Sequence, residues 1–394
     1  MSKTYTKGDV IEVKIEKIVP RGFGIGFAEN LTVLVPLSAP GDVLLVKIRD
    51  LKKSTAFADI VETRQHGPTR ITPPCQYYGV CGGCDFQHLD YPSQLEAKVG
   101  IVQDCLKRIG KIDFEGEINI IESPNQFEYR SRARWHIDVK NKQIGYFRRD
   151  SNTIVDIAEC PILTPGMQST LEHLRNDIAW ERFWEDAAEM EAVSGEGGRV
   201  STHSMALGDP AAEIDIEING EQYSYTAATF FQANRSLTGK LIETAIGDAT
   251  GDNALDLYAG VGLFSLPMAR RFKTVTGVEG NSVSIALAEK NAFRAKLTNL
   301  EFANKGVEGF LYNNRKKKSD FVLLDPPRSG TEKETIPMLA AMKTPHVSYV
   351  SCEPSILARD LRILLDAGYR VESITALDLF PQTHHVETVV HLKI

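Results

Sequence analysis

The sequence predicts a protein of mixed class, in which a small all-β unit is followed by α/β structure. Three observations support this division: short alternating strands with glycine turns come first, a group of cysteines follows, and buried strands then alternate with helices to the end of the chain. We expect three domains, at residues 1–64, 65–226 and 227–394. A length of 394 residues allows two or three domains with cores of their own.

The composition predicts an ordinary globular protein of the cytoplasm. Hydrophobic residues make up 42% and charged residues 25% of the chain, and no apolar run is long enough to span a membrane. The first residues lack the apolar centre of a signal peptide, so we expect a cytoplasmic protein without membrane association. In that compartment the six cysteines are not expected to form structural disulfides, which leaves metal binding or catalysis for a clustered set.

The net charge of −7, taken alone, argues against nucleic acid as a partner. The charge is uneven, however, because residues 128–149 hold seven lysines and arginines against two acidic residues. A local basic surface can bind phosphate on an acidic protein, so the total charge does not decide the question.

Residues 8–62 are predicted to form a small β-barrel. Five short stretches alternate at a period of two or follow a glycine turn, at residues 10–18, 21–27, 31–35, 42–49 and 54–61. Five short strands with glycine kinks suit an OB-like barrel, whose outer face commonly holds oligonucleotides. The pattern resembles a TRAM domain, an RNA-binding barrel attached to RNA-modifying enzymes. A barrel that serves only for packing is the alternative, and we favour RNA binding.

A metal site is predicted around four cysteines of the central region. Cys75, Cys81 and Cys84 are separated by five and two residues, and paired glycines let the backbone curl around a bulky group. Cys160, followed by proline, supplies a fourth thiolate and completes the ligand set of an iron–sulfur (4Fe–4S) cluster. Zinc would use the same four sulfurs, and the spacing alone leaves both metals open.

Two other parts of the central region carry no predicted chemistry. A helix is predicted at residues 91–110 and is expected to pack on the C-terminal domain, with Cys105 as a core residue. Residues 165–225 are the least informative segment, and we assign them no function.

Three arginines occupy every second position of a short stretch in the central region. On a strand, Arg130, Arg132 and Arg134 would present three guanidinium groups on one face, which suits a phosphate backbone. Nearby aromatic residues could stack on unpaired bases. The alternative is a solvated strand face, and we favour contact with RNA.

The start of the C-terminal domain predicts a cofactor site. Residues 253–262 form a predicted strand that ends in a glycine turn around Gly260, and a helix is predicted at 263–271. The next strand ends at Glu279, where a carboxylate can accept both hydroxyls of a ribose. A nicotinamide dinucleotide site would want a third glycine where Ser265 stands. The turn therefore favours S-adenosylmethionine, which has no pyrophosphate to bind.

Three further side chains are predicted to face the same cleft. A buried strand ends at Asp325, and the two prolines after it fix the backbone that aims the carboxylate. Cys352 stands between a strand predicted at 346–350 and a helix predicted at 355–367, where open α/β sheets bind ligands and helix amides favour a thiolate. A buried structural cysteine is the alternative. Glu387 lies near the start of a terminal strand.

Six motifs occur in one order along this chain: the four cysteines, Phe231-Gln-Ala-Asn234, Asp256-Leu-Tyr-Ala-Gly-Val-Gly262, Asp325-Pro-Pro-Arg328, Ser351-Cys-Glu-Pro354 and His385-Val-Glu387. Together they resemble the RNA 5-methyluridine methyltransferase family, in the branch that carries a TRAM barrel and a 4Fe–4S cluster. The resemblance covers nearly the whole chain and is weakest at residues 165–225.

The resemblance implies a fold and a set of roles. The C-terminal domain would be a class I, Rossmann-like S-adenosylmethionine-dependent methyltransferase domain, and the central α+β domain would hold the iron–sulfur cluster. Cys352 would be the nucleophile and Glu387 the general base, and the cofactor contacts would come from Gln232, Tyr258, Gly260, Glu279 and Asp325. The family often has asparagine in place of Glu353 and a polar residue in place of Leu263, which puts fine cofactor contacts and RNA preference in doubt.

The chemistry explains why these residue types are required. Carbon 5 of uracil is too weak a nucleophile to attack a sulfonium methyl group, but thiolate addition to carbon 6 makes carbon 5 electron-rich. A carboxylate then removes the carbon 5 proton, and elimination returns the thiol. The target base must be flipped out or unpaired to be attacked.

The function expected from these observations is 5-methyluridine formation in RNA. We favour 23S ribosomal RNA as the substrate, with transfer RNA as the alternative, and we expect a monomer. A non-catalytic iron–sulfur RNA-binding protein is a rival that the intact Cys352 and Glu387 oppose. Methylation of cytosine carbon 5 is a second rival, but a proline commonly precedes the nucleophile there, and Ser351 does so here.

Overall fold

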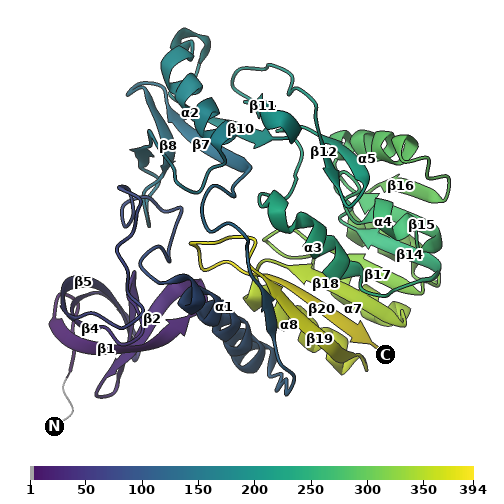
Figure 1. Ribbon diagram of the computed structural model, residues 1–394. Coiled ribbons are helices and arrows are strands. Elements are labelled where there is room, and N and C mark those ends of the chain that lie inside the picture. Colours follow the sequence, from purple (N-terminus) through teal and green to yellow (C-terminus); the bar gives the residue numbers. More distant parts are fainter. Residues whose placement is uncertain (1–3) are drawn as a thin grey trace.

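The computed structural model of the protein describes residues 4–394, so the first three residues of the expected N-terminal domain lie outside the description. Figure 1 shows a small barrel at one side, a β-rich central part above it, and an α/β sheet at the other side. No helix among the described residues is long and apolar enough to cross a membrane.

The N-terminal segment folds as a closed five-stranded barrel, as the sequence predicts. Its strands follow the order β1-β2-β3-β5-β4. Alternate side chains point inward because strand residues alternate between the two faces, and those of Val33 and Leu44 are completely buried. Gly26 lies where β1 and β2 approach so closely that a Cβ would stand 2.3 Å from the carbonyl of Lys14. The bounds are β1 Val10–Val19, β2 Phe23–Ala28, β3 Leu31–Pro36, β4 Val43–Lys52 and β5 Thr55–Gln65.

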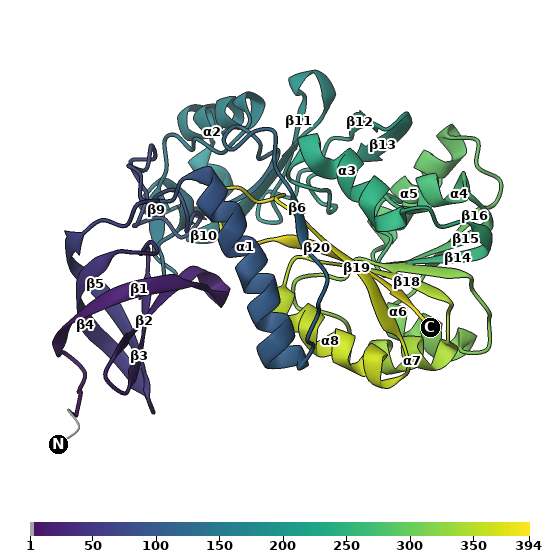
Figure 2. The same cartoon turned by 60° about the horizontal axis from the view of Figure 1, so that its bottom comes forward.

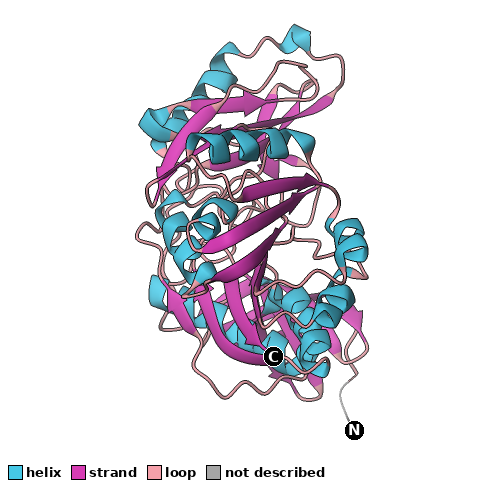
Figure 3. Cartoon of the chain, turned by 90° about the vertical axis from the view of Figure 1, so that its right-hand side faces the viewer, coloured by secondary structure: helices cyan, strands magenta, loops and turns pink. Residues whose placement is uncertain are grey.

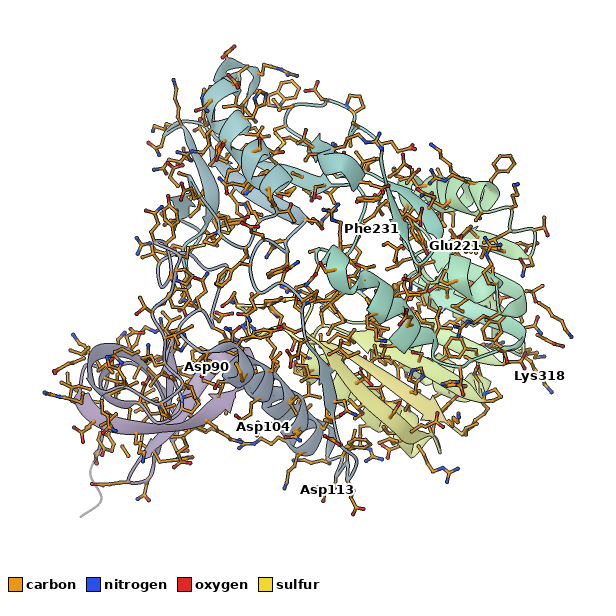
Figure 4. The ribbon with its side chains drawn as sticks, viewed as in Figure 1. Asp90, Asp104, Asp113, Glu221, Phe231 and Lys318 are labelled. Carbon is orange, nitrogen blue, oxygen red and sulfur yellow. The ribbon has the colours of Figure 1, made fainter. Side chains whose placement is uncertain are left out.

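Helix α1 (Tyr91–Cys105) lies between the barrel and the C-terminal sheet (Figure 2). It begins at Asp90, whose side chain accepts a hydrogen bond from the amide of Ser93, and a π-helical turn continues it over Leu106–Gly110. Asp90 and Asp104 mark its two ends in Figure 4. Its apolar face packs in the same buried cluster as Leu357 and Leu361 of the C-terminal part, and Cys105 is buried in that cluster.

The central part contains a five-stranded sheet in the order β11-β10-β7-β8-β9, covered by α2 (Figure 1). Trp135 of β7 and Met167 of α2 belong to its core. The strands are β7 Arg132–Asp138, β8 Gln143–Phe147, β9 Ile154–Asp156, β10 Ala187–Ser194 and β11 Val200–His203, and α2 spans Pro165–Asp177. Short 3-10 turns occur at Pro20–Gly22, Trp180–Arg182 and Glu196–Gly198.

The C-terminal sheet has eight strands in the order β16-β15-β14-β17-β18-β20-β19-β6. The first five are parallel, and β20 is antiparallel to both β18 and β19. The edge strand β6 (Asn119–Ile121) comes from the central stretch of the chain. The others are β14 Gly251–Leu257, β15 Phe272–Glu279, β16 Leu300–Asn304, β17 Phe321–Leu324, β18 His346–Ser351, β19 Arg370–Leu377 and β20 Glu387–Lys393.

Helices cover both faces of this sheet, as Figures 2 and 3 show. One buried cluster joins α6, α7, α8 and α1 to the sheet, and another joins α3, α4 and α5 to the opposite face. The hairpin of β12 (Ile214–Ile218) and β13 (Glu221–Tyr225), which precedes the expected boundary at residue 227, packs in the second cluster. The helices are α3 Arg235–Ile246, α4 Ser265–Ala269, α5 Ser282–Arg294, α6 Val307–Asn314, α7 Thr335–Met342 and α8 Pro354–Asp366.

Candidate active site and cysteine cavity

The register of two central strands brings Cys352 and Glu387 together. Cys352 follows the last residue of β18, and Glu387 is the first residue of β20. Because Ser351 pairs with Thr388 in this antiparallel ladder, the next position along brings Cys352 beside Glu387. Helix α8 begins at Pro354, so the thiol lies between a strand end and a helix start, as the sequence predicts.

Burial and neighbouring carboxyl groups favour the neutral forms of both Cys352 and Glu387. Burial raises the pKa of the Cys352 thiol to about 12, with Glu387 adding to the rise. Burial also raises the pKa of Glu387 well above its usual range, and Asp325 adds to that rise. Glu387 is 3% exposed, and its Oε1 has no hydrogen-bond partner among the described residues. This free oxygen is available to a ligand.

Arg328 is a member of this site that the sequence reasoning missed. It follows Asp325 by three residues, and its guanidinium lowers the pKa of both Cys352 and Glu387 against the larger effect of burial. The guanidinium also lies over the ring of Phe380, 6.0 Å from the ring centre. The Asp-Pro-Pro-Arg sequence carried the signal, because the prolines that aim Asp325 also fix the direction of the next side chain.

Two further carboxyl groups lie behind the nucleophile. Asp256 is completely buried, accepts a hydrogen bond from the hydroxyl of Ser265 through Oδ2, and keeps Oδ1 without a partner among the described residues. Burial raises the pKa of Asp256 and of Asp325 to about 7, and each of the two rises is increased by a neighbouring carboxylate. Such a group of negative oxygens suits a cationic ligand.

The expected cofactor residues surround one pocket. Gln232, Tyr258, Gly260 and Asp325 all line it. Glu279, the fifth, is joined to its wall, because Oε2 accepts the Gly260 amide at 3.1 Å. Gly260 has a φ of +53°, and open space lies where its Cβ would stand. The sequence reasoning did not assign the exposed Phe230 or the buried Phe231, which line the same pocket; Phe231 is labelled in Figure 4.

These residues fit S-adenosylmethionine. A glycine without a side chain leaves room for the ligand beside the turn, and Glu279 stands at the end of β15, where a ribose would be held. The carboxyl groups of Asp256 and Asp325 are available to its positive charge. The pocket and the Cys352–Glu387 pair share Asp325, so the two form one continuous site.

The structure also brings the four expected metal ligands together. Cys75, Cys81, Cys84 and Cys160 line a single cavity of about 70 Å³. Within residues 4–394, no three histidine, cysteine, aspartate or glutamate side chains are arranged to hold a single metal ion. A zinc ion with bonds of about 2.3 Å to sulfur would draw its four thiolates to roughly 3.8 Å from one another. Four thiols around one cavity are the donor set that iron–sulfur clusters use.

The three candidate RNA-binding arginines do not share one exposed face. Arg130 precedes β7 and lines the cysteine cavity. Arg132 donates to the carbonyls of Thr229 and Ala227 and pairs with Glu191, at 2.5 Å for both Thr229 and Glu191. Arg134 is exposed and also pairs with Glu191. The alternation of buried and more open positions does extend from Tyr129 to Trp135, as the period-two pattern predicts. The guanidinium groups differ because Arg132 is tied to Glu191 and Arg130 borders the cysteine cavity.

Comparisons with known proteins agree with this geometry. A family model described as tRNA (uracil-5-)-methyltransferase matches residues 197–394, which is half of the chain, and a TRAM domain model matches residues 5–61. A relative from Protochlamydia amoebophila, an uncharacterized RNA methyltransferase, is 32% identical over 97% of both chains.

The chain belongs to the tRNA (uracil-5-)-methyltransferase family. It is therefore an RNA uracil-C5 methyltransferase that acts on RNA with S-adenosylmethionine as the methyl donor.

Two proteins whose names state their RNA substrates resemble this methyltransferase over nearly its whole length. The 23S rRNA (uracil(1939)-C(5))-methyltransferase of Photorhabdus laumondii is 28% identical over 96% of this chain and 95% of its own. The crystal structure of the Pyrococcus abyssi tRNA (uracil-54, C5)-methyltransferase with S-adenosyl-L-homocysteine is 28% identical, covers 97% of this chain and 100% of its own, and has a TM-score of 0.75.

Proposed function

We propose that this methyltransferase forms 5-methyluridine at a specific uridine of 23S rRNA through a covalent adduct with Cys352. The observation that carries the mechanism is the meeting of a thiol, a buried carboxyl group and a guanidinium beside the cofactor pocket. The choice of ribosomal RNA is supported by relatives named for uracil 1939 of 23S rRNA. Transfer RNA is the second candidate, because the solved Pyrococcus abyssi structure is of a tRNA uracil-54 enzyme.

Cys352 carries out the first step of the proposed reaction. Arg328 favours its thiolate, since a neighbouring positive charge lowers the pKa of the thiol. The thiolate adds to carbon 6 of uracil, and the electron pair of the 5,6 double bond moves to carbon 5 and the oxygen on carbon 4. S-adenosylmethionine, when bound, supplies a sulfonium methyl group for in-line transfer to carbon 5.

Glu387 carries out the last step of the proposed reaction. Its carboxylate takes the proton from carbon 5, the electrons of that bond rebuild the 5,6 double bond, and the bond between sulfur and carbon 6 breaks. The thiolate of Cys352 returns, and Glu387 passes its proton to solvent. Asp325 lies between this pair and the cofactor pocket, where it is suited to hold the cofactor and the base in register.

The four cysteines and their cavity are proposed to hold a 4Fe–4S cluster. The supporting observations are the common cavity and the four-thiol donor set, which iron–sulfur clusters use. Its role is proposed to be structural, because the loop that carries Cys84 is hydrogen-bonded to the segment before Glu387: the amide of Asp85 donates to the carbonyl of Gln382 at 2.9 Å.

The proposal predicts the effect of Cys352→Ala. Methylation of a 23S rRNA transcript should fall by about 10⁴-fold or more, because the substitution removes the nucleophile from a set of residues that act together. The affinity for RNA should stay within about twofold of the wild-type value. The matched control is Cys105→Ala, which removes the buried thiol of α1 and should keep methylation. Turnover by Cys352→Ala would refute the covalent route.

Substrate choice is tested separately. Total RNA from cells with and without the gene is mapped for 5-methyluridine, and purified enzyme is offered 23S rRNA and tRNA transcripts. If 5-methyluridine disappears from a position of 23S rRNA, the result supports the proposal. If it disappears only from transfer RNA, transfer RNA replaces ribosomal RNA as the substrate.

A further inference from the structure

Arg130 brings a positive charge to the wall of the cysteine cavity without a carboxylate to balance it. Its Nε donates to the carbonyl of Arg132 at 2.9 Å. In the part of the chain that the structure describes, its terminal nitrogens have no hydrogen-bond acceptor, and no aspartate or glutamate forms an ion pair with it.

The backbone holds Arg130 in this position. Its amide donates to the carbonyl of Ile162 at 2.7 Å, and its carbonyl accepts from the amide of Thr164 at 3.1 Å. These two residues follow Cys160, so the arginine is fixed to the same loop as the fourth thiol.

A second polar group of the cavity wall also lacks a partner. Tyr146 lines the cavity, and its hydroxyl is buried without a hydrogen-bond partner among residues 4–394. The indole N–H of Trp135 lies beside the phenol oxygen and can only donate toward it. The phenol therefore still needs an acceptor. Protonated thiols are weak acceptors, whereas thiolates and sulfides bound to iron are strong ones.

We propose that Arg130, together with Tyr146, donates hydrogen bonds to the sulfurs of the iron–sulfur group, offsets part of its negative charge, raises its reduction potential and slows its loss. The inference rests on the proposed cluster site. Unpaired donors in a cavity wall are costly unless an anion completes them. Hydrogen bonds to sulfur and net charge are among the features that set the potential of such clusters.

The test compares variants reconstituted anaerobically with iron and sulfide. Arg130→Met should lower the midpoint potential of the cluster, which is measured in a redox titration monitored by electron paramagnetic resonance. It should also speed the loss of the brown colour in air by about 10- to 100-fold, the range seen when a supporting contact of a metal site is removed. Arg130→Lys keeps the charge and should recover part of both properties. Tyr146→Phe should shift both in the same direction by a smaller amount.

Arg134→Met is the matched control, because this exposed arginine contacts Glu191 away from the cavity and should leave both cluster properties unchanged. Equal potential and equal lifetime in Arg130→Met and the wild type would overturn the inference. If Arg130→Met fails to fold, Arg130→Lys and Tyr146→Phe decide it, and wild-type values in both would overturn it too. Failure of the underlying site looks different: the wild-type protein would then take up no iron, or zinc instead.

Discussion

Burial and Glu387 make the thiol of Cys352 harder to ionise, burial and Asp325 do the same to the carboxyl of Glu387, and Arg328 opposes both effects. This arrangement keeps the resting site close to neutral and lets a cationic ligand complete it. Because the proposed mechanism gives these three side chains separate roles, in adding to uracil, removing the carbon 5 proton and balancing charge, each proposed step can be interrupted at a different residue.

Glu387→Gln should stop the proposed reaction after methyl transfer. The amide cannot accept the carbon 5 proton, so elimination fails and the sulfur–carbon bond persists. We expect a methylated protein–RNA adduct that survives denaturing electrophoresis, with turnover reduced by about 10²- to 10⁴-fold, the usual contribution of a general base. Cys352→Ala/Glu387→Gln is the control and should give no adduct. A purely noncovalent Glu387→Gln complex would count against the role of the carboxylate.

The raised pKa of Cys352 predicts how its alkylation depends on pH. The thiol is neutral below its pKa of about 12, so its reaction with iodoacetamide should rise with pH and show no plateau near 8.5, where an ordinary cysteine titrates. Mass spectrometry of the Cys352 peptide measures the rate. Arg328→Gln should slow alkylation at every pH, since it removes the charge that favours the thiolate, whereas Arg362→Gln on α8 should not. Half-maximal reactivity near pH 8.5 would contradict the structure.

At the scale of elements, helix α1 and the segment of residues 378–386 form one unit. Lys98 of α1 pairs with Asp378, both completely buried, and Lys98 also donates to the carbonyl of Phe380 at 2.9 Å. The side-chain amide of Gln94, one turn earlier, makes two hydrogen bonds with Gln382: it donates to the side-chain oxygen and accepts from the backbone amide. This segment leads into Glu387, so the helix holds the chain that approaches the proposed catalytic base.

The cysteine loop holds the same segment from a second side. The amides of Asp85 and Phe86 both donate to the carbonyl of Gln382 at 2.9 Å, and the carboxylate of Asp85 contacts His384 Nδ1 at 2.6 Å. Arg149 joins Asp85 at 2.8 Å and also donates to the carbonyl of Cys84. The metal-ligand loop and the catalytic segment are therefore directly bonded.

Lys98→Met should destabilise this unit strongly. The substitution leaves the carboxylate of Asp378 buried without its cation, which costs roughly 3–5 kcal/mol. Urea unfolding under anaerobic conditions should show a lower midpoint. Adding Asp378→Asn should recover part of the loss, because the uncompensated charge is then removed. An unchanged midpoint in Lys98→Met would show that the buried pair does not hold α1 in place.

At the scale of the whole molecule, local patterns predicted the elements better than they predicted their partners. The five barrel strands, β18, α8 and the common cavity of the four cysteines follow from alternation, spacing and a first-turn proline. The edge strand β6 did not, because three residues carry too little periodicity and its partner β19 lies far along the chain. The hairpin β12–β13 was overlooked, although Ile214, Ile216 and Ile218 alternate before the Asn219-Gly220 turn.

The site shows the same division. The positions of Cys352, Glu387 and Asp325 were predictable because they lie at the same end of neighbouring strands: Asp325 and Cys352 directly follow β17 and β18, and Glu387 begins the antiparallel β20. The surroundings of Arg130 were not predictable, because the cavity that it lines is built from cysteines far apart in the chain. Arg328 was overlooked because the Asp-Pro-Pro-Arg motif was interpreted for its carboxylate alone.

A free cation lies where the barrel meets the central sheet. Arg148 lines a hollow of about 280 Å³ together with Arg49 of β4, and a second hollow of about 350 Å³ together with Phe147. Phe147 is stacked on His136 at 3.7 Å, which offers a flat surface for an unpaired base. Unlike Arg49, which pairs with Asp150, Arg148 has no ion-pair partner among the described residues. This junction therefore combines a phosphate-binding charge with a stacking surface.

Arg148→Gln should weaken RNA binding without changing the chemical step. Loss of one phosphate contact should reduce the steepness of log affinity against log salt by roughly 0.7–0.9, because one fewer counterion is released. Binding to a 23S rRNA fragment over a salt series measures this slope, and single-turnover methylation at saturating RNA should stay near the wild-type rate. Lys273→Gln is the control, since Lys273 lies near the start of β15, opposite the sheet edge that holds Cys352. Equal slopes for Arg148→Gln and Lys273→Gln would place the RNA path elsewhere on the protein.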